Sequence, residues 1–216
     1  MAKPTQTTAH LTNHRRSVNP EEREQANGHR GVIVWFTGFS NSGKSTLANK
    51  IDQILFQQGC KSIVLDGDNV RYGINSDLGF SRKDRKENIR RVGEVAKLFV
   101  SSGMITLTAC ISPYQDDREK VRRLVQEDQF FEIYCKCPIE KCEERDSKGI
   151  YKKARAGLIK NFTGISAPYE PPVNPDLILE TNHDSLEVCT HKTLRLLETG
   201  NVFLESNKIP RHKNTI

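Results

Sequence analysis

The chain has 216 residues, of which 36% are hydrophobic and 28% charged, values that are ordinary for one soluble globular domain. No stretch approaches the roughly 18 consecutive apolar residues of a membrane-spanning helix, so we expect no membrane segment. The formal net charge of +6 is divided between both terminal segments and the body, which argues against a uniformly basic nucleic-acid-binding surface. A local basic site for an anionic small molecule fits this distribution better.

Residues 1–20 are polar and contain no acidic residue, so we expect a flexible arm there, one domain over residues 21–202 and a tail over 203–216. The acid-poor start leaves a short transit peptide open, although a cytoplasmic protein is the default expectation. The cysteines lack the paired Cys-x-x-Cys or His spacing of zinc sites, so we expect reduced structural thiols. They are Cys60, Cys110, Cys135, Cys137, Cys142 and Cys189.

Alternation of strand and helix patterns begins at Gly31. Apolar runs that end in turn residues predict strands at 32–36, 62–65, 104–111, 130–135 and 177–179. Apolar residues at helical spacing predict helices at 44–58, 82–101 and 186–197, and Pro113 is expected to open a further helix. Strands that alternate with helices form βαβ units, so the sequence predicts an α/β fold whose mostly parallel sheet has helices on both faces.

A phosphate-binding loop follows the first predicted strand. The pattern G-x-x-x-x-G-K-[ST] is matched in full by Gly38, Phe39, Ser40, Asn41, Ser42, Gly43, Lys44 and Ser45. Its backbone N–H groups and the start of the next helix suit phosphate oxygens, and Thr46 is included in the expected ATP site. Lys44 is expected to reach the β- and γ-phosphates, and the Ser45 hydroxyl to ligate Mg²⁺. The strand before the loop and the helix after it argue against a chance glycine loop.

The second strand ends in an acidic segment, Asp66-Gly67-Asp68-Asn69. Strand ends beside the phosphate loop face the crevice where ligands bind, so a carboxylate here can help hold Mg²⁺ or accept a proton from an attacking hydroxyl. A simple turn is the alternative, since the composition is turn-like. The one Asn-Lys-x-Asp match, Asn49–Asp52, lies inside the helix predicted at 44–58 and does not follow a strand, and the third strand ends without an aspartate. These features favour a kinase that acts on a small alcohol over a GTPase or a motor ATPase.

Further blocks continue this pattern along the chain. They are Leu65–Arg71, Asp77–Ser81, Asp84–Arg91, Ile111–Tyr114, Lys148–Gly157 and Asn161–Ile165. From about residue 21 to residue 202 the sequence resembles the adenylylsulfate (APS) kinase family, which has a P-loop NTPase fold with a lid. The resemblance implies transfer of the ATP γ-phosphate to the 3′-hydroxyl of APS, giving PAPS for sulfate activation, with Mg²⁺ as cofactor. It also implies a homodimer, and it raises a functional link to ATP sulfurylase.

The resemblance implies an acceptor site drawn from these blocks. Its residues are Asp66, Gly67, Asp68, Asn69, Arg71, Phe80, Arg85, Asn88, Ile111, Ser112, Lys148 and Phe162. Arg71 and Arg85 suit the phosphosulfate, because guanidinium groups pair bidentately with such oxyanions. Phe80 and Phe162 resemble the two aromatic residues that sandwich the adenine of APS in this family. The alternative is that either ring belongs to the core.

The catalytic residues implied are Lys44, Asp68 and Ser112, with Ser45 and Asp68 at the metal. The family pattern treats Ser112 as a phosphoserine intermediate, but direct in-line transfer needs only positioning and charge neutralisation. Residues 145–160 are strongly basic, and we interpret them as a lid over two anionic ligands, the alternative being a solvated basic helix.

The sequence departs from the family pattern at Phe39 and Asn41 of the phosphate loop and at residues 108–110. Two rival functions stay open from the sequence. One is a P-loop kinase with a different small acceptor, which would not need Phe80 or Phe162. The other is a catalytically weak subunit that binds nucleotide and regulates a sulfate-activating partner.

Overall fold

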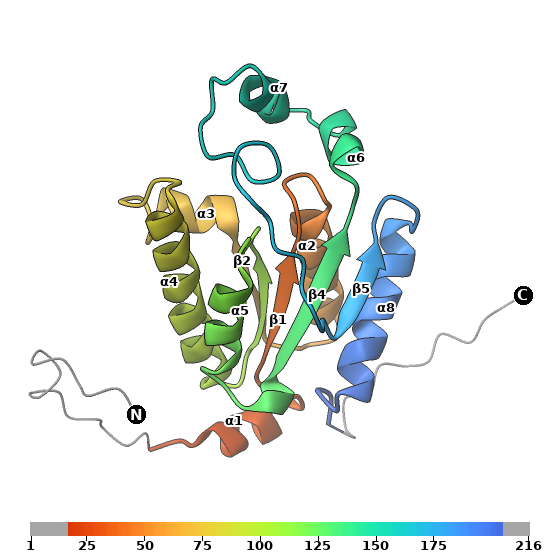
Figure 1. Ribbon diagram of the computed structural model, residues 1–216. Helices are drawn as coiled ribbons and strands as arrows, with labels where there is room; N and C mark the ends of the chain where they lie inside the picture. The colour runs from red at the N-terminus through yellow and green to blue at the C-terminus, as the bar shows by residue number, and fades with distance from the viewer. Residues whose placement is uncertain (1–16, 205–216) are drawn as a thin grey trace, which may run out of the picture.

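The computed structural model describes residues 17–204, and its centre is a five-stranded parallel sheet (Figure 1). The strand order is β2-β3-β1-β4-β5. The strands are β1 (Val32–Thr37), β2 (Ser62–Asp66), β3 (Ile105–Ala109), β4 (Phe130–Lys136) and β5 (Leu177–Glu180). All residues of the central strand β1 are buried, as its unbroken apolar run predicts for a parallel strand covered on both faces.

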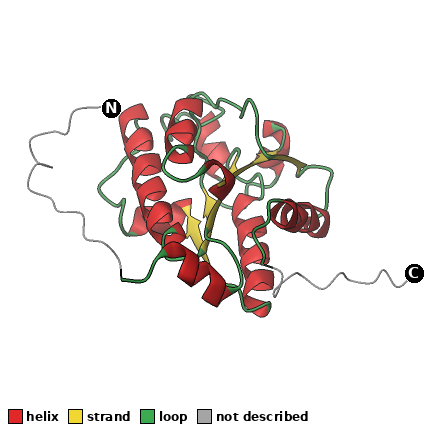
Figure 2. Ribbon diagram, turned by 90° about the horizontal axis from the view of Figure 1, so that it is seen from below, coloured by secondary structure: helices red, strands yellow, loops and turns green. Residues whose placement is uncertain are grey.

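Helices cover both faces of the sheet (Figure 2). One layer consists of α2 (Lys44–Gln57) and α8 (Leu186–Thr199), and the other of α4 (Arg82–Val100) and α5 (Gln115–Arg122). Shorter helices are α1 (Pro20–Asn27), α3 (Gly67–Tyr72), α6 (Ile139–Glu144) and α7 (Ile150–Arg155), with a 3₁₀ turn at Glu127–Gln129. Both α6 and α7 lie beyond the carboxyl ends of the strands, at the top of Figure 1.

The two layers bury separate apolar clusters on opposite faces of the sheet. Leu47, Ile51 and Leu55 of α2 pack on one face, while Ile89 and Val92 of α4 pack on the other. These are the residues whose helical spacing predicts an apolar stripe. The predicted α/β architecture is therefore confirmed. No helix within residues 17–204 is long and apolar enough to cross a bilayer.

The element boundaries differ from the prediction around β3. The predicted strand at 104–111 ends at Ala109, because the chain then turns through Ser112, whose φ is +41°. The next helix begins at Gln115 with Tyr114 as N-cap, so Pro113 precedes it and does not open it.

The two chain ends of the domain also differ from the predicted limits. Helix α1 already begins at Pro20, with a capping box between Asn19 and Glu22. Phe203 is buried in the core, and the Leu204 N–H donates to the Gly28 carbonyl at 3.0 Å. The body therefore reaches at least residue 204. The remainder of the expected arm and tail, residues 1–16 and 205–216, lies outside the described residues.

Candidate active site

Loops at the carboxyl ends of β1, β2 and β3 enclose a cavity of about 670 Å³. This is the edge of a parallel α/β sheet where ligands bind. The cavity is bordered by the phosphate loop, by the acidic segment after β2, by the start of α4, by the turn after β3 and by part of the lid. Most sequence-predicted site residues line it: Ser40, Asn41, Gly43, Lys44, Ser45, Thr46, Asp66, Gly67, Asp68, Arg71, Phe80, Arg85, Asn88, Ile111, Ser112, Lys148 and Phe162.

The phosphate loop owes its shape to two glycines and an asparagine. Gly38 has φ +144°, and a Cβ there would lie 2.5 Å from the Cys135 carbonyl oxygen, so no larger residue fits. Gly43 has φ +92° and is the N-cap of α2. Asn41, one of the departures from the family pattern, has φ +61°, a conformation that asparagine tolerates. Its Nδ2 donates to the Cys142 carbonyl at 3.2 Å, which attaches the loop to α6.

Lys44 supplies a buried cation at the floor of the cavity. Its side chain lies at the first residue of α2, and Nζ donates to the Phe39 carbonyl at 2.6 Å. Burial lowers the pKa of Lys44. A desolvated ammonium beside a helix N-terminus is an arrangement that favours bound phosphate.

Asp66 and Asp68 line the cavity at the carboxyl end of β2. Asp66 is the N-cap of α3, and its Oδ1 accepts from the Asp68 N–H at 2.9 Å. The acidic segment is thus the start of a short helix and not a simple turn. Asp68 is exposed, and its Oδ2 lies 3.4 Å from Nζ of Lys148. This contact joins the lid to the body across the cavity.

The hydroxyl of Ser45 and the two carboxylates that line this cavity fit Mg²⁺. Ser45 is exposed in the first turn of α2 and lines the same cavity as both aspartates. Mg²⁺ is usually held by one or two carboxylates together with substrate phosphates and water, so a hydroxyl and a carboxylate suffice from the protein. Within residues 17–204 no group of three or more His, Cys, Asp or Glu side chains could form an all-protein metal site.

Two arginines surround the ring of Phe80. The Arg71 and Arg85 guanidinium carbons lie 4.5 and 5.6 Å from its centroid. Arg85 Nε donates to the Phe80 carbonyl at 3.0 Å and its Nη2 to the Asn161 carbonyl at 2.6 Å. Arg71 Nη1 donates to the Gly79 carbonyl at 2.9 Å. Burial lowers the pKa of both arginines, and their remaining N–H groups give this end of the cavity a cationic lining.

Asn88 and Phe162 complete the acceptor end of the cavity. Asn88 is buried one helical turn after Arg85, and its Oδ1 accepts from Asn75 Nδ2 at 3.0 Å. Phe162 packs edge-on against Tyr151 of the lid, with ring centroids 4.9 Å apart. Phe80, in contrast, is 56% exposed. Both rings therefore line one cavity, as predicted, but Phe162 also contributes to packing.

The hydroxyl of Ser112 is engaged with the protein. It accepts from Trp35 Nε1 at 3.0 Å and donates to the Cys110 carbonyl at 3.3 Å, and the residue is 1% exposed. The sequence does not predict these bonds, because Trp35 lies on β1, far from Ser112 along the chain.

Some predicted residues do not line the cavity. They are Gly38, Phe39, Ser42 and Asn69. Ser42 is fully buried inside the loop, and Asn69 lies on the exposed side of α3. The Phe39 ring packs against Tyr169, which follows the lid in sequence, at a centroid distance of 4.9 Å. Its backbone carbonyl, however, still contacts Lys44.

A second cavity of about 400 Å³ adjoins the phosphate loop on the side of β5 and α8. It shares Asn41, Gly43 and Thr46 with the first cavity. The other lining residues are Leu47, Arg145, Thr181, Asp184, Leu186 and Cys189. The sequence interpretation missed this part of the site. The signal available was positional, since residues 181–184 follow β5 and hence lie at the ligand-binding edge of the sheet.

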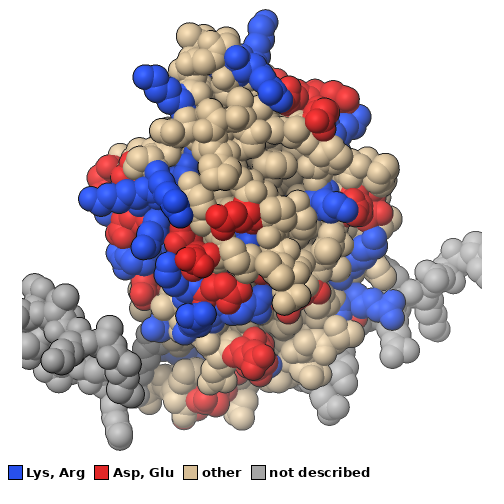
Figure 3. Space-filling view, viewed as in Figure 1, with Lys and Arg blue, Asp and Glu red and all other residues tan. Residues whose placement is uncertain are grey.

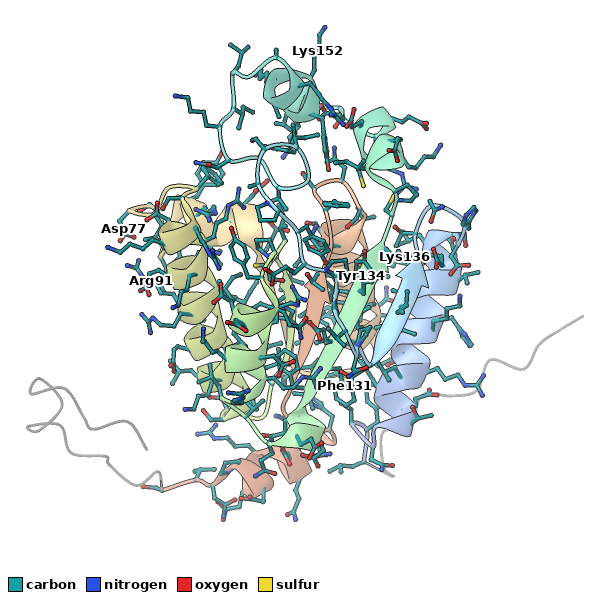
Figure 4. The ribbon with its side chains drawn as sticks, viewed as in Figure 1. Asp77, Arg91, Phe131, Tyr134, Lys136 and Lys152 are labelled. Carbon is teal, nitrogen blue, oxygen red and sulfur yellow. The ribbon has the colours of Figure 1, made fainter. Side chains whose placement is uncertain are left out.

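The basic segment 145–160 forms the outer wall above the first cavity and contains α7. The Asp146 carboxylate accepts from the N–H groups of Ile150 and Tyr151 at 3.0 and 2.7 Å, which caps this helix. The Tyr151 hydroxyl donates to the Ser40 carbonyl at 2.9 Å, so the segment rests on the phosphate loop. Lys152 lies on the outer side of α7 (Figure 4).

Charge on this segment is divided between the site and the solvent. Lys148 and Lys160 line the first cavity, and Arg145 lines the second. Arg155 instead pairs with Glu143, and basic side chains project from the top of the molecule in Figure 3. On the flank, Arg91 pairs with Asp77 at 2.7 Å beside α4, outside the cavities (Figure 4). Only part of the positive charge of this segment therefore faces the cavities, and its closure as a lid stays a prediction.

Comparisons with known proteins agree with this geometry. The family model for adenylylsulphate kinase matches residues 30–180. A probable adenylyl-sulfate kinase of Halalkalibacterium halodurans is 56% identical over 183 residues, which cover 85% of this chain and 91% of that protein. The adenylyl-sulfate kinase of Acaryochloris marina is 55% identical over 86% of this chain and 90% of its own length. The Mycobacterium tuberculosis APS kinase, solved in complex with AMPPNP and APS, has a TM-score of 0.75 and 46% identity, covering 79% of this chain and 99% of its own.

Proposed function

The chain belongs to the adenylylsulphate kinase family, and from this premise we propose how it transfers the γ-phosphate of ATP to the 3′-hydroxyl of APS, giving ADP and PAPS. One observation carries the assignment. A complete phosphate loop shares a single cavity with a cationic and aromatic acceptor end formed by Arg71, Arg85, Phe80 and Phe162.

The donor phosphates bind at the phosphate loop. Its N–H groups and Lys44 stabilise the charge that spreads over the transferring phosphoryl group. Ser45 and Asp68 would hold Mg²⁺, which when bound neutralises charge on the β- and γ-phosphates. Asp68, with Asp66 behind it, orients the acceptor hydroxyl and accepts its proton. For this task Asp68 must exchange its contact with Lys148 for one with substrate.

The acceptor lies at the other end of the cavity. The arginine guanidiniums bind the phosphosulfate, and the rings of Phe80 and Phe162 stack on the adenine. Lys148 brings a further cation from the lid. The second cavity receives the base of the donor nucleotide, beside Arg145, because it is continuous with the phosphate loop through Asn41, Gly43 and Thr46.

Ser112 acts, in our proposal, without forming a covalent intermediate. Its oxygen is already bonded to Trp35 and to the Cys110 carbonyl. No histidine lies in its motif to activate it as a nucleophile. Its part is to shape the acceptor wall between β3 and α5.

The assay that tests this proposal follows ADP release from Mg-ATP with and without APS and identifies the nucleotide product. APS-dependent ADP release with an equal amount of PAPS is expected. Release that does not depend on APS would favour a kinase for another acceptor, and APS binding without turnover would favour the regulatory subunit. Lys44→Ala should lose most turnover and keep its circular dichroism spectrum, and wild-type rates in this variant would contradict the assignment.

Assembly and localisation remain predictions. A homodimer is expected by resemblance, and light scattering of the purified chain measures it directly. The functional link to ATP sulfurylase rests on chemistry alone, since APS must be supplied by an enzyme that joins sulfate to a nucleotide. A cytoplasmic location, with a transit peptide left open, likewise stays untested.

A further inference from the structure

Arg118 of α5 makes four side-chain hydrogen bonds although it lines neither cavity. It is 1% exposed. Its Nη1 donates to the Ser112 carbonyl at 2.7 Å, and its Nη2 to the Glu170 carbonyl at 2.9 Å and to Gln115 Oε1 at 2.5 Å. Its Nε donates to Glu132 Oε1 at 2.6 Å. One planar guanidinium therefore joins the end of β3, strand β4 and the segment that returns from the lid.

The bond to Ser112 meets the backbone where it is strained. Ser112 is not glycine, yet its φ is +41°, a left-handed conformation that is unfavourable for an L-residue. Such a conformation persists only where surrounding contacts determine it. Trp35 Nε1 holds the side-chain oxygen and Arg118 holds the main-chain oxygen, so the two donors fix the peptide from two directions.

The strained residue belongs to the acceptor wall. Ile111, Ser112 and Pro113 all line the first cavity. A second bond fixes the same wall, because Thr37 Oγ1 donates to the Ile111 carbonyl at 2.7 Å. The Glu170 N–H donates to the Pro113 carbonyl at 2.8 Å, so the segment after the lid runs along this wall. The contacts that fix the Ser112 peptide therefore also fix the shape of the wall against which APS binds.

Glu132 is the buried counter-charge of Arg118. It lies on β4 directly beside Trp35 in the sheet register and is 2% exposed. Burial raises the pKa of Glu132, while Arg118 and Arg122 favour its ionised form. A buried ion pair is weak evidence for stability on its own account, since apolar replacements of similar volume are often neutral or stabilising. The geometry of the other three Arg118 bonds is the better explanation for an arginine here.

We propose that Arg118 is a positioning residue for the acceptor: by holding the Ser112 carbonyl it fixes the wall formed by residues 111–113 against which APS binds. The inference rests on the proposed function, and it assigns the effect to the acceptor end of the site. The phosphate loop and the second cavity make no hydrogen bond with Arg118 among the bonds described for residues 17–204. We therefore expect replacement of Arg118 to leave ATP binding unchanged.

The test separates positioning from simple charge balance with two conservative variants. Arg118→Lys keeps a cation near Glu132 but cannot span to Ser112, Gln115 and Glu170 together. Glu132→Gln removes the charge and leaves Arg118 free to hold Ser112. We expect Arg118→Lys to raise KM for APS at least tenfold with KM for ATP within twofold of wild type. Glu132→Gln should change both values by less than threefold.

A third variant keeps the test valid if the lysine variant does not fold. Arg118→Met/Glu132→Met replaces the buried pair by apolar side chains of similar length, which usually restores folding. The proposal expects a normal melting temperature with KM for APS still raised. A wild-type KM for APS in this double variant, or equal increases of both KM values in Arg118→Lys and Glu132→Gln, would overturn it.

Assay of the wild-type enzyme in the same series separates failure of the proposed function from failure of the positioning role. If wild type shows no APS-dependent ADP release, the proposed function fails whatever the variants do. If wild type turns over APS and the variants keep its KM, only the positioning role fails.

Discussion

Phe80 and Phe162 face the same cavity from different surroundings, so their replacements should differ. Phe80 is 56% exposed, and Phe162 packs into an apolar cluster with Tyr151 at the base of the lid. Phe80→Ala should raise KM for APS about 2- to 12-fold, as expected for a stacking contact of roughly 0.5–1.5 kcal/mol, without lowering the melting temperature. Phe162→Ala should raise KM and lower the melting temperature together. Steady-state kinetics and thermal unfolding check both expectations.

A matched control for these two variants is Phe56→Ala, which removes an exposed ring on α2, far from the cavity. It should leave KM for APS unchanged. An unchanged KM in Phe80→Ala as well would show that this ring does not bind the base.

The sequence predicts those site residues whose chemistry requires a particular residue type at a particular spacing in the motif. Lys44, Ser45, Asp66 and Asp68 line the cavity because the phosphate loop and the carboxyl end of the next strand along the chain lie at the same edge of a parallel sheet. Arg145 and Thr181 of the second cavity were not predicted, since they are 36 residues apart and meet through one bond, from Arg145 Nη2 to the Thr181 carbonyl at 2.7 Å. The engagement of Ser112 with Trp35 depends likewise on sheet packing.

Among the elements, α7 of the lid depends on a cap from outside its own first turn. Gly149 at its N-cap has no side chain to offer, and the Asp146 carboxylate takes the N–H groups of Ile150 and Tyr151. Asp146→Ala should destabilise this short helix by about 0.5–2 kcal/mol, the usual cost of a lost N-cap. A looser lid admits water, so we expect more ADP released per PAPS formed.

The control for this element is Glu144→Ala, which removes an exposed acid near the lid that pairs only with Lys141 in the described ion pairs. It should keep the ADP-to-PAPS ratio of wild type, because exposed pairs contribute little. An unchanged ratio in Asp146→Ala would indicate that the cap of α7 does not govern water access.

The long helices were predictable and the six-residue helices were not. Helices α2, α4 and α8 repeat apolar residues over several turns, which gives a clear period. Helices α3, α6 and α7 have six residues each, too few for a period to be recognised. For α1 a signal was present, because Asn19, Pro20 and Glu22 form the start pattern of a capped helix, but its side chains add none to the buried core.

For the whole molecule, His29 joins three distant segments and makes stability depend on pH. It is fully buried, its Nε2 accepts from the Lys61 N–H at 2.8 Å, and Nδ1 therefore carries the proton donated to the Arg30 carbonyl at 3.1 Å. Residue 29 also pairs with Phe203 near the other end of the described chain. A protonated ring would lose the bond from Lys61.

Burial lowers the pKa of His29 in the folded state, so the unfolded chain binds a proton more readily. The stability that neutral His29 provides is complete above its unfolded pKa of about 6.5 and is lost as pH falls toward the lower folded value. Urea unfolding between pH 7.5 and pH 5 should show this loss. His29→Gln should be less stable at pH 7.5 with a flatter profile, and an equally steep profile would exclude His29 as the cause.

The two cavities lie on opposite sides of the phosphate loop, one toward β2 and α4 and the other toward β5 and α8, and they share Asn41, Gly43 and Thr46. In the proposed function, the ADP leaving group would lie on the side of the second cavity and the acceptor hydroxyl on the side of the first, so that the two flank the transferred phosphorus atom. Transfer between them is then one displacement, which inverts the configuration of a γ-phosphate made chiral with sulfur and oxygen isotopes. Transfer through a phosphoserine at Ser112 would require two displacements and would retain the configuration of the γ-phosphate.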